Sequence, residues 1–319
     1  MDQQLISVIL SIYNENILWI DQAIKSILKQ TYKNIELIII LDNPKNFDAH
    51  KLLLELEKKD KRIILVFNEI NIGLAKSLNI GLSIAKGDYI ARMDADDISY
   101  NNRFEVQMNY FKNYSELDMI SASVDYINES DEFTDQNSNK LFTPRQIKKL
   151  LPIYNMLIHP TYIMKREVME NLKGYRIFDT SEDYDFSLRA LSEGYTIIHI
   201  SDKLLKYRRR SNSMSLGNAL VSQLNSDYIR KLYKERQHLN SDSYSFEDMK
   251  KYSTVSEKEK NTYSDTLNKI YQTKKSNFLR LSYFTLGGLV KSNYFRQYLP
   301  KMLIIKFLNK YYYRIFRGK

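Results

Sequence analysis

Four apolar runs of strand length alternate with helical segments over the first 97 residues, and this alternation restricts the possible fold classes more than any other feature of the sequence. The runs cover residues 5–14, 35–41, 62–67 and the stretch after Gly87. The segments between them carry apolar residues at helical spacing, over 17–30, 47–59 and 71–85. Such alternation is typical of a parallel sheet with helices on both faces. The sequence therefore predicts an α/β fold with a Rossmann-like, doubly wound, mostly parallel sheet.

Three carboxylates follow the fourth strand, at Asp94, Asp96 and Asp97. Carboxylates this close repel one another unless a cation or hydrogen-bond donors compensate them. Open α/β sheets bind ligands at the carboxyl ends of their strands, and a set of oxygen ligands suits Mg²⁺ or Mn²⁺. Asp42 ends the second strand and is expected at the same edge. The alternative is a solvated acidic turn, with Asp42 as a turn residue before Pro44, and from these residues alone both interpretations stand.

The second half of the chain predicts further elements and candidate residues. The expected elements are a helix over 99–114, a strand over 119–127, a loop or hairpin tip over 128–140, a short helix over 143–151, a strand-like stretch over 159–164, a helix from Ser181 to Gly194 and a strand over 196–200. His159 is a lone histidine, and such residues are more often structural than catalytic. Ser181 is a helix N-cap signal, but the adjacent pair Glu182 and Asp183 exceeds what capping requires. The run 208–210 of three arginines is either a solvated face or a clamp for a diphosphate.

Composition excludes several classes of site. There is no cysteine, which rules out disulfides, thiolate catalysis and cysteine-ligated metals, and four scattered histidines argue against a histidine metal site. The formal net charge of +10 fits solubility, a phosphate-bearing ligand, nucleic acid or an anionic membrane. No window reaches the ~18 apolar residues of a membrane span, and the start of the chain lacks the basic residues of a signal peptide. A cytoplasmic protein is expected.

The character of the chain changes after Ser211. Strand signals stop, a helix is expected over 221–239, and a linker follows over 240–243. No acidic residue follows Asp265, and basic and aromatic residues alternate from Lys274 to Lys319. This tail, interrupted by Pro300, is typical of interfacial amphipathic helices. An ordinary basic helical subdomain is the alternative.

Taken in order, five stretches resemble the family 2 glycosyltransferases, which have the GT-A fold. The resemblance covers residues 7–215. The matching stretches are 7–14, 26–32 with 36–39, 71–73 with Asn79 and Gly81, 94–97 with Arg103 and Gln107, and Glu182–Asp183, of which the last two look like the DxD and ED motifs. Two positions depart from the pattern, because only Asp42 remains of the two acids frequent after the second strand, and Leu78 replaces an arginine found in some members.

The resemblance implies an inverting glycosyltransferase that uses Mn²⁺ or Mg²⁺. It would move a sugar from a nucleotide-sugar, with UDP expected, to a hydroxyl of a saccharide or lipid-linked saccharide in surface polysaccharide synthesis. Asp96 would hold the metal with support from Asp94, while Asp183 would be the base, next to Glu182 and His159 in the acceptor site. The residues expected to bind the nucleotide-sugar are Ser11, Tyr13, Glu15, Asp42, Asn71, Gly73, Asn79, Arg92, Asp94, Ala95, Arg208 and Arg210.

These implications define two regions and a location. Residues 1–213 are the expected catalytic domain, with a nucleotide-sugar half over 1–98 and an acceptor half over 99–213, and residues 214–319 form the basic helical region. The enzyme is expected on the inner face of the cell membrane, without a nucleic-acid partner. A sugar nucleotidyltransferase is one alternative, but residues 14–16 lack its glycine-rich loop. A non-catalytic RNA- or membrane-binding protein is another, although it leaves the carboxylates unexplained. A degenerate transferase is the third, and the intact acidic motifs argue against it.

Overall fold

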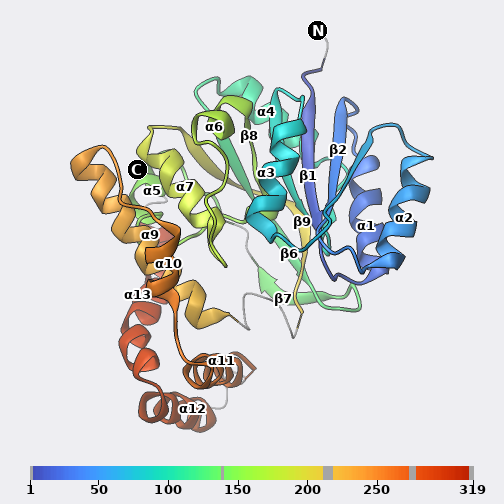
Figure 1. Cartoon of the computed structure of the whole chain (residues 1–319). Coiled ribbons are helices and arrows are strands. Elements are labelled where there is room, and N and C mark those ends of the chain that lie inside the picture. Colours follow the sequence, from blue (N-terminus) through green and yellow to red (C-terminus); the bar gives the residue numbers. More distant parts are fainter. Residues whose placement is uncertain (1–2, 138–139, 211–217, 273–277, 316–319) are drawn as a thin grey trace. The chain divides into compact units, whose positions relative to one another are not determined.

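The computed structural model describes residues 3–137, 140–210, 218–272 and 278–315 (Figure 1). The chain forms two compact units, one of residues 1–177 with 182–210 and one of residues 178–181 with 211–319. The expected boundary at residue 213 lies outside the described residues, as do the end of the resemblance at Ser215 and the tail positions Lys274, Lys275, Arg317 and Lys319.

The first unit begins with the alternating strands and helices that the apolar pattern predicts. They are β1 (Ile6–Ile12), α1 (Ile17–Leu28), β2 (Ile35–Leu41), α2 (Phe47–Glu57), β3 (Ile63–Phe67), α3 (Leu74–Ile84) and β4 (Tyr89–Asp94). The four strands pair in parallel in the order β3-β2-β1-β4. Parallel pairing with crossover helices brings the carboxyl ends of these strands to one edge, where Asp94 ends β4.

Helices cover both faces of this parallel half. Alternate residues of β1, such as Val8 and Leu10, join one core cluster with Ile20 and Ile24 of α1. On the opposite face, Gly81 of α3 lies so close to the sheet that a Cβ there would be 2.6 Å from Ile9 Cγ2. Burial on both sides explains why β1 and β2 read as continuous apolar runs.

The sheet then becomes mixed, which the N-terminal pattern does not show. The remaining elements of this unit are β5 (Ile98–Ser99), α4 (Arg103–Asn113), β6 (Met119–Ile127), β7 (Phe133–Asn137), α5 (Pro144–Leu150), η1 (His159–Thr161), β8 (Ile163–Lys165), α6 (Arg166–Asn171), α7 (Glu182–Ser192) and β9 (Ile197–Arg208). The strand order is β3-β2-β1-β4-β8-β6-β9-β5, with β7 paired to β6. Strand β8 runs antiparallel to both β4 and β6, whereas β6 and β9 are parallel. The α/β fold with a mostly parallel core and helices on both faces is thus confirmed.

Several predicted boundaries are corrected. The stretch 159–164 begins as the 3₁₀ turn η1, and only its end is strand. Strand β9 is one element of 12 residues, rather than a strand that stops at residue 200. Ser181, predicted as the N-cap of α7, has a left-handed backbone with φ 72°, whereas an N-cap residue is ordinarily extended.

The second unit is helical. Its helices are α9 (Ala219–Leu239), α10 (Phe246–Ser253), α11 (Glu257–Gln272), α12 (Phe278–Lys291) and α13 (Asn293–Ile315). Leu220, Tyr263, Phe295 and Tyr298 form part of its core. Helix α13 continues through Pro300, so the predicted interruption is wrong; the proline is exposed, and water can reach the carbonyl group that it leaves unbonded. None of the described helices is long and apolar enough to cross a membrane.

Candidate active site

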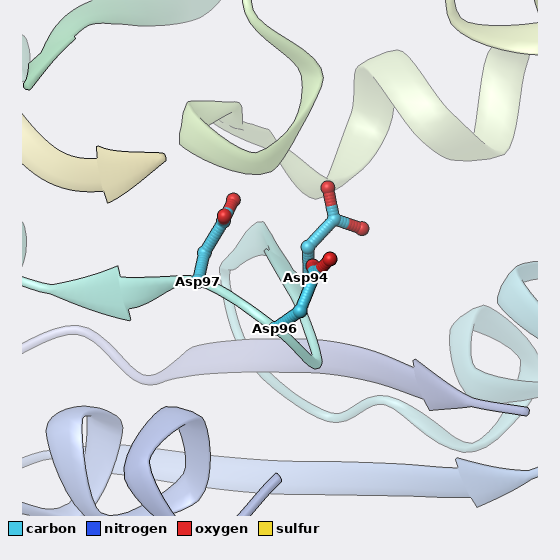
Figure 2. Close-up of side chains that lie close together, drawn as sticks. All are labelled: Asp94, Asp96 and Asp97. Carbon is cyan, nitrogen blue, oxygen red and sulfur yellow. The ribbon is translucent and has the colours of Figure 1, made fainter. Parts of the chain in front are cut away.

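The turn after β4 brings together three carboxylates. Asp94 is the last residue of β4, and Asp96 and Asp97 precede β5. The ligand oxygens that they offer lie within 4.8 Å of one another, and Figure 2 shows the three side chains pointing to the same side of the turn. The predicted metal ligands Asp94 and Asp96 therefore do lie together, with Asp97 as a third acid.

Burial and mutual repulsion disfavour the charged forms of these acids. Burial, followed by the negative charge of Asp94, raises the pKa of Asp96 to about 6. Burial, followed by the negative charges of Asp96 and Asp94, raises the pKa of Asp97 well above its usual value. One oxygen of Asp97 accepts a hydrogen bond from the Arg208 amide at 2.8 Å, but its Oδ2 is buried without a hydrogen-bond partner among the described residues. An oxygen-rich, electron-rich site with an unsatisfied buried oxygen fits a hard divalent cation such as Mg²⁺ or Mn²⁺.

Two arginines at the end of β9 contact this turn in different ways. Arg208 is buried, and its guanidinium donates to the Asp96 carbonyl at 2.8 Å, pairs with Asp131 at 2.5 Å and stacks on Trp19 at 4.8 Å. Arg210 is partly exposed and places Nη2 2.8 Å from Asp96 Oδ2. The guanidinium of Arg208 is thus already bonded to other groups of the protein, whereas Arg210 lies beside the carboxylates with part of its surface open to solvent.

A second acidic group stands at the start of α7. Glu182 and Asp183 are the first two residues of this helix, and Asp183 Oδ2 accepts a hydrogen bond from Asn155 Nδ2 at 2.9 Å. Burial, followed by the charge of Asp183, raises the pKa of Glu182 to about 7. Burial also raises the pKa of Asp183. Of the two, Glu182 has a pKa near neutrality, and a buried carboxyl of this kind can exchange a proton at physiological pH.

Arg92 of β4 connects the two acidic groups. Its guanidinium forms an ion pair with Asp94, and its positive charge lowers the pKa of Glu182 and of Asp183. The side chain is buried, which opposes its charge, yet the carboxylate of Asp94 raises the pKa of Arg92. Its Nε has no hydrogen-bond partner within the described part of the chain. One buried cation therefore faces both the acids after β4 and the acids of α7.

His159 lies on the α7 side of the site. Its Nδ1 is 3.9 Å from Glu182 Oε1, and its Nε2 is 2.9 Å from the hydroxyl of Tyr175. Burial, followed by the positive charge of Arg92, lowers the pKa of His159 well below its usual value, so the ring is neutral. Tyr175 and Asn155 were not predicted, because no motif surrounds them and only the folded chain brings them to the acids.

Asp42 shapes the loop that leads into α3. Its Oδ1 accepts hydrogen bonds from Asn68 Nδ2 at 2.8 Å and from the Ile72 amide at 2.9 Å. Its Oδ2 accepts from the Gly73 amide at 2.8 Å, and Asn71 Oδ1 accepts from the same amide at 3.0 Å. Gly73 has φ 85°, which favours glycine there. The predicted residues Asp42, Asn71 and Gly73 are thus brought together in one hydrogen-bonded loop.

The other predicted donor residues fall at different places. Ser11 is the cross-strand partner of Asp94, and the charge of Glu15 raises the pKa of Asp96. Tyr13 is exposed, and its amide donates to Glu15 Oε2 at 2.7 Å. These residues lie on the β1 side of the carboxylates, while Ala95 is a buried residue of the turn itself.

Asn79 lies with the residues around α7 instead. Its side chain exchanges two hydrogen bonds of 2.8 Å with the backbone of Tyr175. The matched pair Arg103 and Gln107 is structural, because the buried Arg103 donates to the Arg92 carbonyl at 2.8 Å and Gln107 donates to the Thr161 carbonyl at 2.8 Å.

Comparison with known proteins gives consistent matches. The family model described as Glycosyl transferase family 2 matches residues 7–173. An uncharacterised glycosyltransferase of Methanocaldococcus jannaschii is 34% identical over 245 residues, which are 76% of this chain and 84% of that one. The O-antigen biosynthesis glycosyltransferase WbnJ of Escherichia coli is 34% identical over 238 residues, which are 73% of this chain and 90% of that one. The crystal structure of S. aureus TarS 1–349 in complex with UDP-GlcNAc shares the fold, with a TM-score of 0.57, 16% identity, and coverage of 89% of this chain and 80% of that one.

Proposed function

The chain belongs to glycosyl transferase family 2, and on this premise we propose that it is an inverting, metal-dependent glycosyltransferase. The donor is a UDP-sugar that carries a hexose or N-acetylhexosamine. The acceptor is a hydroxyl of a saccharide or lipid-linked saccharide in surface polysaccharide synthesis. The O-antigen relative supports the polysaccharide role, and the UDP-GlcNAc complex of the structural neighbour supports the donor class. The observation that carries the proposal is that the three acids after β4 lie within 4.8 Å of one another, while Arg92, which pairs with Asp94, also acts through its charge on the separate acids of α7.

The acids after β4 form the donor side. Asp94 and Asp96 would hold the divalent ion, and Asp97 would supply a further buried oxygen. A bound ion would offset the negative charge that develops on the diphosphate leaving group. Arg210 binds the diphosphate oxygens, because it stands next to Asp96 and retains exposed surface. Arg208 holds the turn through its backbone and side-chain contacts.

The acids of α7 form the acceptor side. Asp183 accepts the proton of the attacking hydroxyl, and the Asn155 amide orients its carboxylate. Glu182, beside His159, binds the acceptor sugar. A single base with direct displacement inverts the anomeric centre, as it does in single-step inverting glycosidases.

A thermal-shift experiment with the full chain tests the donor side. We expect UDP or a UDP-sugar together with Mn²⁺ to raise the Tm, because a ligand at a hundredfold excess over Kd adds ~2.7 kcal/mol to the free energy of unfolding. Asp96→Asn should lose this shift. Asp48→Asn, the same change at an exposed site in α2, is the matched control and should keep it. The proposal fails if no nucleoside diphosphate or sugar nucleotide shifts the wild-type chain.

Asp183→Asn tests the acceptor side. Loss of a general base lowers kcat by about 10²–10⁴-fold. The amide keeps the size of the side chain, so the Mn²⁺-dependent shift with UDP should remain. If the variant keeps its turnover, or if it loses nucleotide binding, the assignment of the base is wrong.

A further inference from the structure

The second unit exposes an apolar stripe that its own core does not use. On α12, Tyr283, Leu286 and Val290 are 73%, 61% and 78% exposed. Their spacing of three and four residues puts them on one face of the helix. On α13, Leu303 and Ile304 are 58% and 57% exposed. The three residues of α12 are called the exposed stripe below, and Leu303 and Ile304 add exposed apolar surface on the next helix.

The opposite faces of these helices already form the core. A Cβ at Gly288 of α12 would lie 2.5 Å from Thr266 Cγ2 and 2.9 Å from Phe295 Cδ1, so this face packs tightly. On α13, Phe295 and Tyr298 are buried. Folding of the unit therefore does not explain why large apolar side chains occupy the outer faces. Apolar residues grouped at helical spacing on a surface indicate a binding partner.

Charge identifies the class of partner. Residues 266–319 hold 12 of the 48 lysines and arginines and none of the 38 acidic residues, so the preceding part of the chain has 36 basic residues against 38 acidic ones. The net positive charge of the protein thus comes from this segment. Within it, exposed Lys291 follows Val290 directly, and exposed Arg296 lies near the start of α13.

We propose that the exposed stripe inserts into the interfacial layer of an anionic lipid bilayer, with Lys291 and Arg296 against the lipid phosphates. Aliphatic side chains enter the acyl boundary, Tyr283 suits the headgroup layer, and basic residues add attraction to anionic lipid. A second copy of the chain would bring an equally basic surface against this one and be repelled. A nucleic acid would match the charge but would leave Leu286, Val290, Leu303 and Ile304 without partners, because nucleic-acid binding relies on phosphate contacts and aromatic stacking.

Vesicle sedimentation with the full chain tests the proposal without measuring transfer activity, so its outcome is separate from that of the proposed reaction. We expect the wild-type chain to sediment with vesicles of phosphatidylcholine mixed with phosphatidylglycerol, and much less with phosphatidylcholine alone. The double variant Leu286→Asp/Val290→Asp should bind the mixed vesicles at least about tenfold more weakly, because it places two anions in the inserted face.

Leu239→Asp is the matched control. Leu239 ends α9, is 70% exposed and lies outside the exposed stripe, so its variant should bind vesicles like the wild type. Unchanged Tm values establish that the variants are folded. The proposal is overturned if the wild type does not bind the mixed vesicles, or if the double variant and the control bind them equally. A wild-type dimer in solution that the double variant converts to a monomer would assign the stripe to self-association instead.

Discussion

At the scale of single residues, Arg92 should control the protonation of the acids on α7. Its charge lowers the pKa of Asp183, so Arg92→Gln should raise that pKa and leave less of the base ionised at neutral pH. We expect kcat/KM to fall by about 10²–10³-fold and the acidic limb of its pH profile to move to higher pH. Arg92→Lys keeps the charge and should restore the position of the limb. An unchanged profile in Arg92→Gln would contradict this role.

Glu182 should shift the same profile in the opposite direction. The charge of Asp183 raises the pKa of Glu182, which shows that the two carboxylates repel each other, and Glu182→Gln removes this repulsion wherever Glu182 would be ionised. The acidic limb of kcat/KM should therefore move to lower pH. If the acidic limb moves in the same direction in Glu182→Gln and in Arg92→Gln, the profile does not report the ionisation of Asp183.

Glu182 should also make the stability of the protein depend on pH. Its pKa is about 7 in the folded chain against a usual value of 4.5, so the folded state binds the proton more tightly. The free energy of unfolding therefore falls as the pH rises through this window. Glu182→Gln does not titrate, and its Tm should exceed that of the wild type at about pH 8 and approach it at about pH 5. Equal differences at both values would argue against a raised pKa.

The sequence reveals those site residues whose chemical type is itself a signal. Adjacent carboxylates at Asp94–Asp97 and at Glu182–Asp183 have few structural explanations, and both groups lie in the candidate site. The contacts of Asn155 with Asp183 and of Tyr175 with His159 join loops with no pattern of their own. Such contacts depend on tertiary structure, which residue type and spacing do not specify.

At the scale of elements, the end of β9 acts as a clamp on the turn after β4. Arg208 contributes an amide and a guanidinium hydrogen bond there, while Arg210 reaches the carboxylate of Asp96. We expect Arg208→Ala to lower the free energy of unfolding by about 1–3 kcal/mol, because it leaves the Asp96 carbonyl without its donor. Arg210→Ala should leave stability nearly unchanged and raise the KM for the donor. Urea unfolding measures the change in stability, and donor titrations measure the KM. A stable Arg208→Ala variant with a raised KM, together with a destabilised Arg210→Ala variant, would exchange the two roles.

Predictability at this scale follows the length and regularity of each element. Strands β1 to β4 are long apolar runs or follow clear helix ends, and they were predicted. The predicted strand stops at residue 200, within β9, because the pairing of β9 with β6 jumps from Ile200 to Lys203 and leaves Ser201 and Asp202 as a polar bulge. Helix α6 has six residues, too few for a helical period to show.

At the scale of the whole molecule, the uneven charge predicts two different responses to salt. The part before residue 266 is nearly neutral in net charge, with 36 basic and 38 acidic residues. All charged residues from residue 266 onward are basic. Raising the ionic strength should release the chain from anionic vesicles, because salt screens exposed charges. The KM for the donor should change less than the affinity for vesicles, since of its proposed contacts only Arg210 is a partly exposed cation, while Asp97 is buried. Titrations with sodium chloride measure the affinity for vesicles and the KM for the donor. If salt weakens donor binding as much as vesicle binding, the basic segment takes part in donor binding.

The clamp on the acidic turn also bears on the order in which the chain folds. The Arg208 contact with Asp96 joins residues 112 positions apart, so loop-closure entropy opposes it until the intervening strands and helices are in place. A nascent chain that ends shortly after Asp97 already contains all three aspartates, yet it lacks the residue that fixes their turn. Metal affinity should therefore appear late during synthesis or refolding, with the docking of β9, and the time at which Mn²⁺ first binds would mark completion of the catalytic sheet.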